Sequence, residues 1–225
     1  MLGWAQRRKL AVFLVLFVLV VAASAFFVFK ILKPSAHPPP EGKNLSVLWT
    51  RFFEVRDGFV DAAALVENPN NFKVERLVYS FKIYDKNNIL IAIKEGETFA
   101  GPWEKFVIFE PNIGVTERVP GRIVMDVKNA VFVEDFSYFS PKIDVLSTEK
   151  FLDDFSPRIL LNIKNRNDKS LENTQSTIVV YGENKNAIAI SRTKIPFLGI
   201  DEEKSLVFTW PKAVNGAFSI EVFFR

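Results

Sequence analysis

The ionisable side chains of this sequence limit the chemistry that it can perform. It contains 1 histidine and 0 cysteines among 225 residues. His37 lies in the proline-rich stretch KPSAHPPPEGKN, so we expect no histidine in a folded site to act as a general base. Serine–histidine and cysteine–histidine nucleophiles are excluded, as are zinc–thiolate sites.

Carboxylates are the remaining candidates for catalysis or metal binding. They gather in three places, namely Glu95-Gly96-Glu97, Asp153-Asp154 and Asp201-Glu202-Glu203. Their oxygens suit Ca²⁺, and two carboxyl groups facing one cleft would suit glycosidase-type chemistry. Charge clusters between strands are usually solvated turns, and we prefer this interpretation. We therefore expect no catalytic residue, no metal site and no cofactor, and we predict that the protein is not an enzyme.

An apolar segment near the N-terminus predicts a membrane anchor. The 20 residues Leu10–Phe29 carry no charge. As a helix rising about 1.5 Å per residue, they would span the roughly 30 Å hydrocarbon core of a bilayer. The basic run Arg7–Lys9 precedes them, and such flanks tend to stay in the cytoplasm. We predict a cytoplasmic N-terminus over residues 1–9 and a single transmembrane helix over residues 10–32, which contacts the lipid bilayer.

A cleavable signal peptide is the alternative interpretation of this segment. Ala23-Ser24-Ala25 fits a cleavage pattern after Ala25, but the apolar run continues to Phe29, which favours a retained anchor. Both interpretations export the rest of the chain to the periplasm or cell surface. A proline-rich stalk is predicted over residues 33–44.

The net charge of +3 does not indicate a nucleic-acid partner. Four of the 29 basic residues, Arg7, Arg8, Lys9 and Lys30, belong to the anchor and its flanks, which leaves 25 basic against 26 acidic residues. The exported part is near neutral and has no basic run. We therefore expect no nucleic-acid binding.

Beyond the stalk, apolar residues recur with a period of two. Examples are Leu77-Tyr79-Phe81-Ile83 and Phe218-Ile220-Val222-Phe224. Turn clusters such as Asn68–Asn71 and Asn165–Asp168 separate these segments. Many short, half-buried strands predict an all-β fold of the β-sandwich type.

The sequence also repeats itself. Val66–Asn70 resembles Ile163–Asn167 at an offset of 97, and Ile91-Ala92-Ile93 recurs at Ile188-Ala189-Ile190. Val47–Thr50 recurs at an offset of 98, and Phe106–Pro111 resembles Leu206–Pro211 at an offset of 100. We predict two tandem immunoglobulin-like modules, over residues 45–135 and 141–225, joined by a junction over residues 136–140.

Two short motifs resemble known families. Phe81-Lys82-Ile83-Tyr84-Asp85 resembles the F-x-L-Y-D signature of FxLYD domains, and Val66-Glu67-Asn68-Pro69-Asn70 resembles a strand end of late-embryogenesis-abundant type 2 (WHy-like) domains. The resemblance implies small β-sandwiches in an exported or membrane-anchored protein, and it implies no activity. In the second module Asn165-Arg166-Asn167 departs from the N-P-N pattern.

Aromatic residues crowd the junction and provide a candidate partner surface. They are Phe132, Phe136, Tyr138, Phe139, Phe151 and Phe155. Exposed apolar patches mark interfaces, although these side chains would also suit packing between or within the modules. We therefore expect a non-catalytic interaction or scaffold protein of the cell envelope, with an envelope protein as partner. The alternative is a stress-related module that binds lipid or a small ligand.

Overall fold

The computed structural model describes residues 16–24, 40, 42–115, 118–135, 138, 140–152 and 155–225. The chain separates into the units Met1–Pro38 and Pro39–Arg225. Residues 16–24 are helical, and the hydroxyl of Ser24 donates to the carbonyl of Val20 at 2.8 Å. In the described part of the chain, no helix is long and apolar enough to cross a membrane. The remainder of the predicted span over 10–32, and most of the stalk over 33–44, lie outside the described residues.

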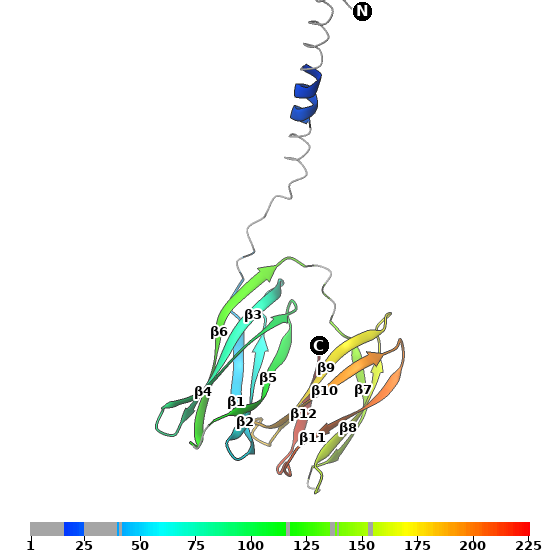
Figure 1. Cartoon of the computed structure of the whole chain (residues 1–225). Coiled ribbons are helices and arrows are strands. Elements are labelled where there is room, and N and C mark those ends of the chain that lie inside the picture. Colours follow the sequence, from blue (N-terminus) through cyan, green and yellow to red (C-terminus); the bar gives the residue numbers. More distant parts are fainter. Residues whose placement is uncertain are drawn as a thin grey trace, which may run out of the picture. The chain divides into compact units, whose positions relative to one another are not determined.

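The second unit consists of strands that form two β-sandwiches (Figure 1). The first sandwich contains β1 (Ser46–Arg56), β2 (Phe59–Glu67), β3 (Lys73–Asp85), β4 (Leu90–Ala100), β5 (Lys105–Gly114) and β6 (Pro120–Val133). The second contains β7 (Ile143–Phe151), β8 (Arg158–Asn165), β9 (Leu171–Tyr181), β10 (Ala187–Leu198), β11 (Glu203–Thr209) and β12 (Ser219–Phe224). The predictions of a mainly β fold and of two sandwiches are confirmed.

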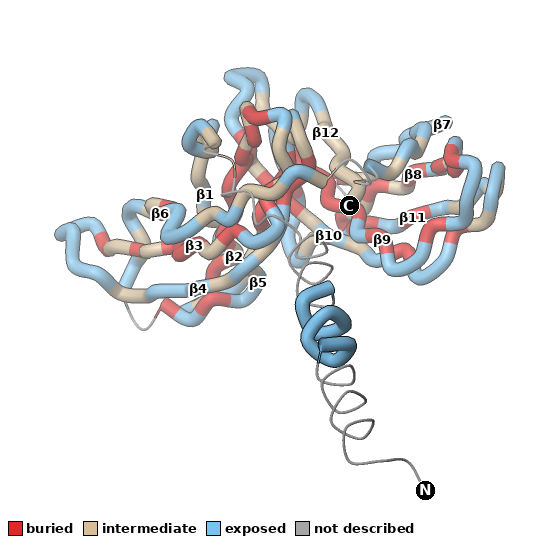
Figure 2. The backbone as a smooth tube through the Cα atoms, turned by 90° about the horizontal axis from the view of Figure 1, so that it is seen from above, coloured by how far each residue is buried: buried red, intermediate tan, exposed pale blue. Residues whose placement is uncertain are grey.

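Each sandwich pairs two three-stranded antiparallel sheets. The sheets have the orders β1-β2-β5 and β4-β3-β6 in the first sandwich, and β11-β8-β7 and β10-β9-β12 in the second. Alternate residues of these strands fill a separate core in each sandwich. Figure 2 marks the buried residues along the strands of both sandwiches. Phe81 and Ile83 are fully buried in the first core, as their shared face predicts. Phe208 and Ile163 occupy the second core.

Strand pairing shows which residues of the two sandwiches are equivalent. Ala64 pairs with Ile108 and Leu161 pairs with Leu206, so β5 and β11 are related by an offset of 98. The offset of 100 expected from sequence similarity is therefore wrong by two residues. A shift of two keeps every side chain on its own face of the sheet, so the apolar pattern could not reveal the error.

Equivalent turns also share a backbone conformation. Asn88 and Lys185 both adopt a positive φ, of 62° and 58°, and Trp103 and Asp201 do so at 55° and 53°. None of these is a glycine, which would adopt such angles most easily. The left-handed turns are therefore a requirement of the repeated fold.

Candidate functional site

The aromatic residues predicted as a partner surface occupy different environments. Phe132 packs against the first core, and its ring lies so close to Gly42 that a Cβ there would meet it at 2.6 Å. The hydroxyl of Tyr138 donates to Oε2 of Glu104 at 3.0 Å. Phe136 and Phe139 lie outside the described residues.

Phe151 and Phe155 lie at the far end of β7 from the junction. Phe151 pairs with Arg158, whose guanidinium is 4.4 Å from its ring, and Phe155 is fully exposed. β7 has 9 residues, so about 27 Å separates its two ends. The structure therefore does not bring the four described aromatic residues together into one patch.

Three described carboxylates of the predicted clusters, those of Glu97, Glu202 and Glu203, form hydrogen bonds or ion pairs within the fold. Glu97 forms an ion pair of 2.9 Å with Arg76, and Glu202 accepts the backbone N–H of Gly199 at 2.6 Å. Asp153 and Asp154 lie outside the described residues. Within the described ranges, no group of three or more histidine, cysteine, aspartate or glutamate residues could hold a metal ion.

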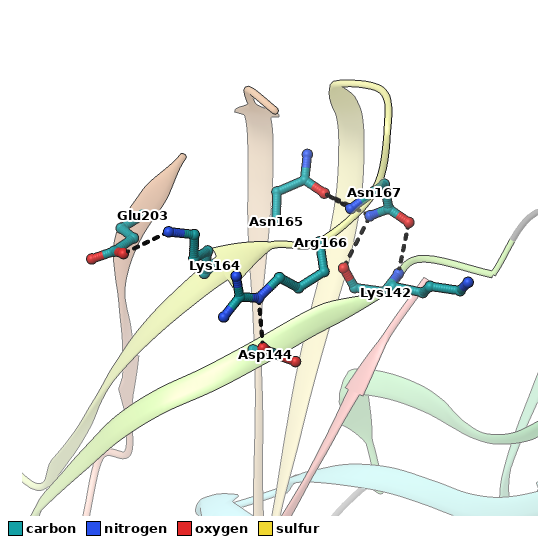
Figure 3. A network of polar contacts seen from close by, with 7 residues as sticks. All are labelled: Lys142, Asp144, Lys164, Asn165, Arg166, Asn167 and Glu203. Carbon is teal, nitrogen blue, oxygen red and sulfur yellow. Dashed lines mark hydrogen bonds and ion pairs between the residues drawn. The ribbon is translucent and has the colours of Figure 1, made fainter. Parts of the chain in front are cut away.

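The asparagines of the repeated motif form a clasp beside the ends of several strands. Figure 3 shows Asn165 and Asn167, with Lys142 alongside. The Asn165 amide donates to the carbonyls of Lys169, Leu198 and Gly199 at 3.0, 3.2 and 2.9 Å, and its oxygen accepts the backbone N–H of Asn167 at 2.9 Å. Asn167 in turn exchanges two hydrogen bonds of 3.0 Å with the backbone of Lys142. The two asparagines therefore bind backbone groups of several segments that meet at this end of the sandwich.

The first sandwich contains the same clasp. Asn68 donates to the carbonyls of Phe72 and Gly101 at 2.8 and 2.7 Å, and Asn70 exchanges hydrogen bonds of 2.7 and 2.8 Å with Lys43. Both asparagines are buried. The motif is therefore structural, because its polar atoms are used in joining three segments of each sandwich.

A third apolar cluster joins the two sandwiches. It consists of Ala63, Leu65 and Val107 from the first sandwich and Val179, Ala187 and Ile190 from the second. Partly buried aromatic residues pack against it, namely Trp49, Phe53, Phe109, Tyr181 and Phe223. The contact therefore buries the outer face of the β1-β2-β5 sheet against the outer face of the β10-β9-β12 sheet.

The two faces in contact are not equivalent to each other. In the other sandwich, the sheet equivalent to each of them has a polar outer face. The row Trp49–Leu65–Val107 corresponds by register to the row Ser147–Asn162–Ser205. Asn162 donates to Ser147 at 2.8 Å and accepts from Ser205 at 2.6 Å. Likewise, Val179 and Phe223 correspond to Lys82 and Asp126, which form an ion pair of 2.6 Å. In each pair of equivalent outer faces, the apolar face is therefore the one that is buried between the sandwiches.

Our sequence interpretation missed this interface, although a signal for it was present. Residues 62–66 of β2 are all buried, as are residues 176–180 of β9, whereas β8 alternates between buried and partly or fully exposed residues. A continuous apolar run is typical of a strand that is covered on both faces.

Arg225 ties the end of β12 to the first sandwich. Its guanidinium lies 3.0 Å from Glu104, and 4.5 and 4.4 Å from the ring centroids of Phe99 and Phe106. It also donates to the carbonyl of Phe99 and to the hydroxyl of Thr98. Burial lowers the pKa of Arg225, and the Glu104 carboxylate opposes this effect. A guanidinium stays charged, so this is a buried ion pair.

Tyrosines near the interface donate to carboxylates. Tyr79 bonds to Glu110 at 2.5 Å, and Tyr181 bonds to Glu221 at 3.0 Å. Burial, together with the neighbouring carboxylate, raises the pKa of Tyr181 to about 12 and raises that of Tyr79 further. Both phenols therefore act as hydrogen-bond donors at neutral pH.

A groove of about 720 Å³ lies beside β9. Residues 169–175 line one side, and Phe99, Phe109, Glu110 and Arg192 are among the residues on the others. Its lining is mixed: the charged Glu110 and Arg192 accompany the aromatic rings of Phe99 and Phe109. The groove lies at the described boundary between the sandwiches.

Comparison with known proteins leaves the family open. No family model matches the chain, and no curated protein matches it. Among solved structures, red sea bream transglutaminase is similar at 11% identity with a TM-score of 0.25; the match covers 82% of this chain. It spans 29% of the transglutaminase chain.

Proposed function

We propose that this chain is a membrane-anchored extracytoplasmic protein that acts as a non-catalytic interaction or scaffold module of the cell envelope. The anchor rests on the apolar run within residues 10–32 and the basic residues before it. The observation that carries the scaffold role is the docking of the sandwiches through the cluster around Leu65. It makes one compact two-sandwich unit, whose loops and strand edges are available for contacts with a partner.

The finer fold assignment is part of this proposal. We infer tandem immunoglobulin-like sandwiches related to the FxLYD and late-embryogenesis-abundant type 2 domains. Support comes from the clasp found in both sandwiches and from the F-x-L-Y-D-like segment. In that segment Phe81 is buried, and Oδ1 of Asp85 accepts the N–H groups of Asn87 and Ile89 at 2.9 and 2.8 Å. These residues therefore fill the core and close a turn.

Site-specific photocrosslinking of the full chain in its native membrane tests the interaction role. Photoreactive residues would replace the exposed aromatic residues Trp103 and Phe218, with Ser205 on the polar face as the matched control. We expect one or a few envelope proteins to be captured at the loop positions and not at Ser205. Failure to capture any protein at any position would contradict the interaction role.

Binding of lipid or a small ligand is the second candidate. The groove beside β9 is the observation that favours it, because its volume would accommodate a small molecule. The charged side chains of Glu110 and Arg192 make it a poor site for an acyl chain. Native mass spectrometry of the protein from its own membrane would support this candidate if a small molecule copurified in place of a protein partner.

A further inference from the structure

The same turn follows the fourth strand of each sandwich, beside the clasp. The carboxylate of Glu104 accepts the backbone N–H of Gly101, and that of Glu202 accepts the backbone N–H of Gly199. In each sandwich a clasp asparagine also donates to the carbonyl of this glycine. The glycine, the glutamate and the asparagine therefore hold the turn, and the side chains of the two residues between glycine and glutamate take no part in these bonds.

Each turn nevertheless carries a large apolar side chain in solvent. Between the glycine and the glutamate, the first turn contains Trp103, which is 67% exposed, and the second contains Ile200, which is 56% exposed. Phe197, just before the second turn, is also exposed. We call Trp103, Phe197 and Ile200 the clasp-end residues. None of the three belongs to the core clusters, and exposed apolar side chains that gather on one surface mark a site of interaction.

The two turns lie on the same side of the two-sandwich unit. Glu104, which closes the first turn, forms an ion pair of 3.0 Å with Arg225 at the end of β12. The groove beside β9 is lined by residues 98–99, which precede the first turn, and by residues 169–171, which follow the second clasp. The first residue of β9 pairs with Leu198, directly before the second turn. The clasp-end residues therefore border one end of the unit.

The segment that leads from the predicted anchor enters the first sandwich at this same end. The backbone of Lys43 exchanges hydrogen bonds of 2.7 and 2.8 Å with the side chain of Asn70, whose carbonyl accepts the N–H of Trp103 at 2.9 Å. The predicted span ends at residue 32, which is 11 residues before Lys43. A fully extended chain of this length covers at most about 40 Å. The predicted anchor would therefore keep Trp103 within reach of the bilayer surface.

The side chains at this end suit the interface of a bilayer. Tryptophan favours the headgroup level, because its ring is apolar and its N–H can still find a partner. One exposed lysine lies beside each clasp, Lys43 in the first sandwich and Lys142, shown in Figure 3, in the second. Lysines attract anionic headgroups. A short tether holds the membrane at an effective concentration on the order of mM, so a weak affinity is sufficient.

We propose that the clasp-end residues dock onto the headgroup region of the bilayer that holds the anchor. Trp103 makes the main contact, because the equivalent residue of the second turn is Asp201. This inference rests on the proposed membrane anchor and adds a second contact with the same membrane. The other end of the unit, which includes Phe218, then faces a protein partner, and a protein captured from position 103 is one embedded in this membrane.

Spin labels on the full chain test the docking. The chain has no native cysteine, so single labels can be attached at Asn71→Cys beside the first turn, at Asn184→Cys in the turn after β9, and at Val20→Cys in the predicted span. The protein would be reconstituted in vesicles made of equal parts of phosphatidylcholine and phosphatidylglycerol. The ratio of collisions with oxygen to collisions with a water-soluble nickel chelate increases with burial in the bilayer. We expect a severalfold higher ratio at position 71 than at position 184.

Two equally exposed aromatic residues provide a matched pair of variants. Trp103 and Phe218 are both 67% exposed, and Phe218 bonds to the carbonyl of Tyr181, at the far end of β9 from the clasp. Trp103→Ser should lower the collision ratio at position 71 to nearly that at position 184, whereas Phe218→Ser should leave it unchanged. An equal ratio at position 71 in both variants would overturn the proposal.

The label at position 20 separates failure of the docking from failure of the anchor. A high ratio at position 20 with a low ratio at position 71 overturns the docking, and the proposed anchor stands. A low ratio at position 20 contradicts the anchor itself. Burial of position 71 in native membranes but not in the protein-free vesicles would overturn the bilayer as the docking surface in favour of a membrane protein.

Discussion

Replacing Leu65 by asparagine should separate the two sandwiches without unfolding either. Leu65 is 4% exposed and lies on the outer face of β2, in the cluster between the sandwiches. Its neighbours Ala64 and Val66 point into the first core. Asparagine is the natural residue at the equivalent position, Asn162, where the face is exposed. The substitution therefore changes the interface and leaves both cores intact.

The expected effect is large for a single substitution. Loss of a buried leucine removes about 1.5–3 kcal/mol of burial free energy. An amide buried without a partner costs about 1–3 kcal/mol more. Together they amount to about 2.5–6 kcal/mol, which is substantial compared with the stability of a whole domain. This loss should weaken the docking of the two sandwiches and leave the folding free energy of each sandwich nearly unchanged.

Small-angle X-ray scattering and urea unfolding of the full chain measure this effect. We expect Leu65→Asn to increase the radius of gyration and to split a cooperative unfolding transition into two. Asn162→Ala is the matched control, because the same register position in the second sandwich faces solvent. It removes two solvent-exposed hydrogen bonds, so its effect on the free energy of unfolding should be about 1 kcal/mol, well below that of Leu65→Asn.

The two variants together can refute the reasoning. An unchanged radius and an unchanged urea midpoint for Leu65→Asn would mean that the cluster does not hold the sandwiches together. Collapse of all β structure in that variant would mean that the first sandwich cannot fold without its neighbour.

Four further predictions concern three individual contacts and the membrane topology. Asn165→Ala should lower the free energy of unfolding by about 3 kcal/mol in urea titrations, because the fully buried Asn165 amide donates to three backbone carbonyls. Arg225→Ala should cost about 1.5–3 kcal/mol in the same assay, because the largely buried Glu104 carboxylate loses its cation and keeps only its neutral donors, and lysine should restore only part of this loss. The pKa of Asp85 is lowered by hydrogen bonds from the backbone N–H groups of Ile89 and Asn87 and from Arg118. The stabilising effect of the Asp85 carboxylate is therefore present above about pH 3.9 and is lost as the pH falls through the lower folded pKa. Asp85→Asn should flatten this acid dependence of the urea midpoint. Because the chain has no native cysteine, an impermeant maleimide should label Asn184→Cys in intact cells and Gln6→Cys only after permeabilisation; the reverse pattern would contradict the proposed topology.

The turn motifs show which hydrogen bonds a local sequence pattern can predict and which it cannot. Asparagines after an apolar strand predict a turn, because their side chains bond to nearby backbone. The clasps around Asn68 and Asn165 contain these local bonds. They also contain bonds to Gly101 and Leu198, each 33 residues away along the chain. Those partners depend on the strand order, which the local pattern does not contain.

The sequence by itself determined the β-strands, their inward faces and the division into two sandwiches. Strand alternation and a repeated pattern depend on near neighbours, so they can be read along the chain. Only the tertiary structure decided which outer faces meet and where Arg225 binds. An apolar side chain on an outer face, such as Leu65, has the same local sequence signature whether water or another sheet covers it. The difference arises from residues more than 110 positions away, such as Val179 and Ile190, whose approach depends on the complete fold.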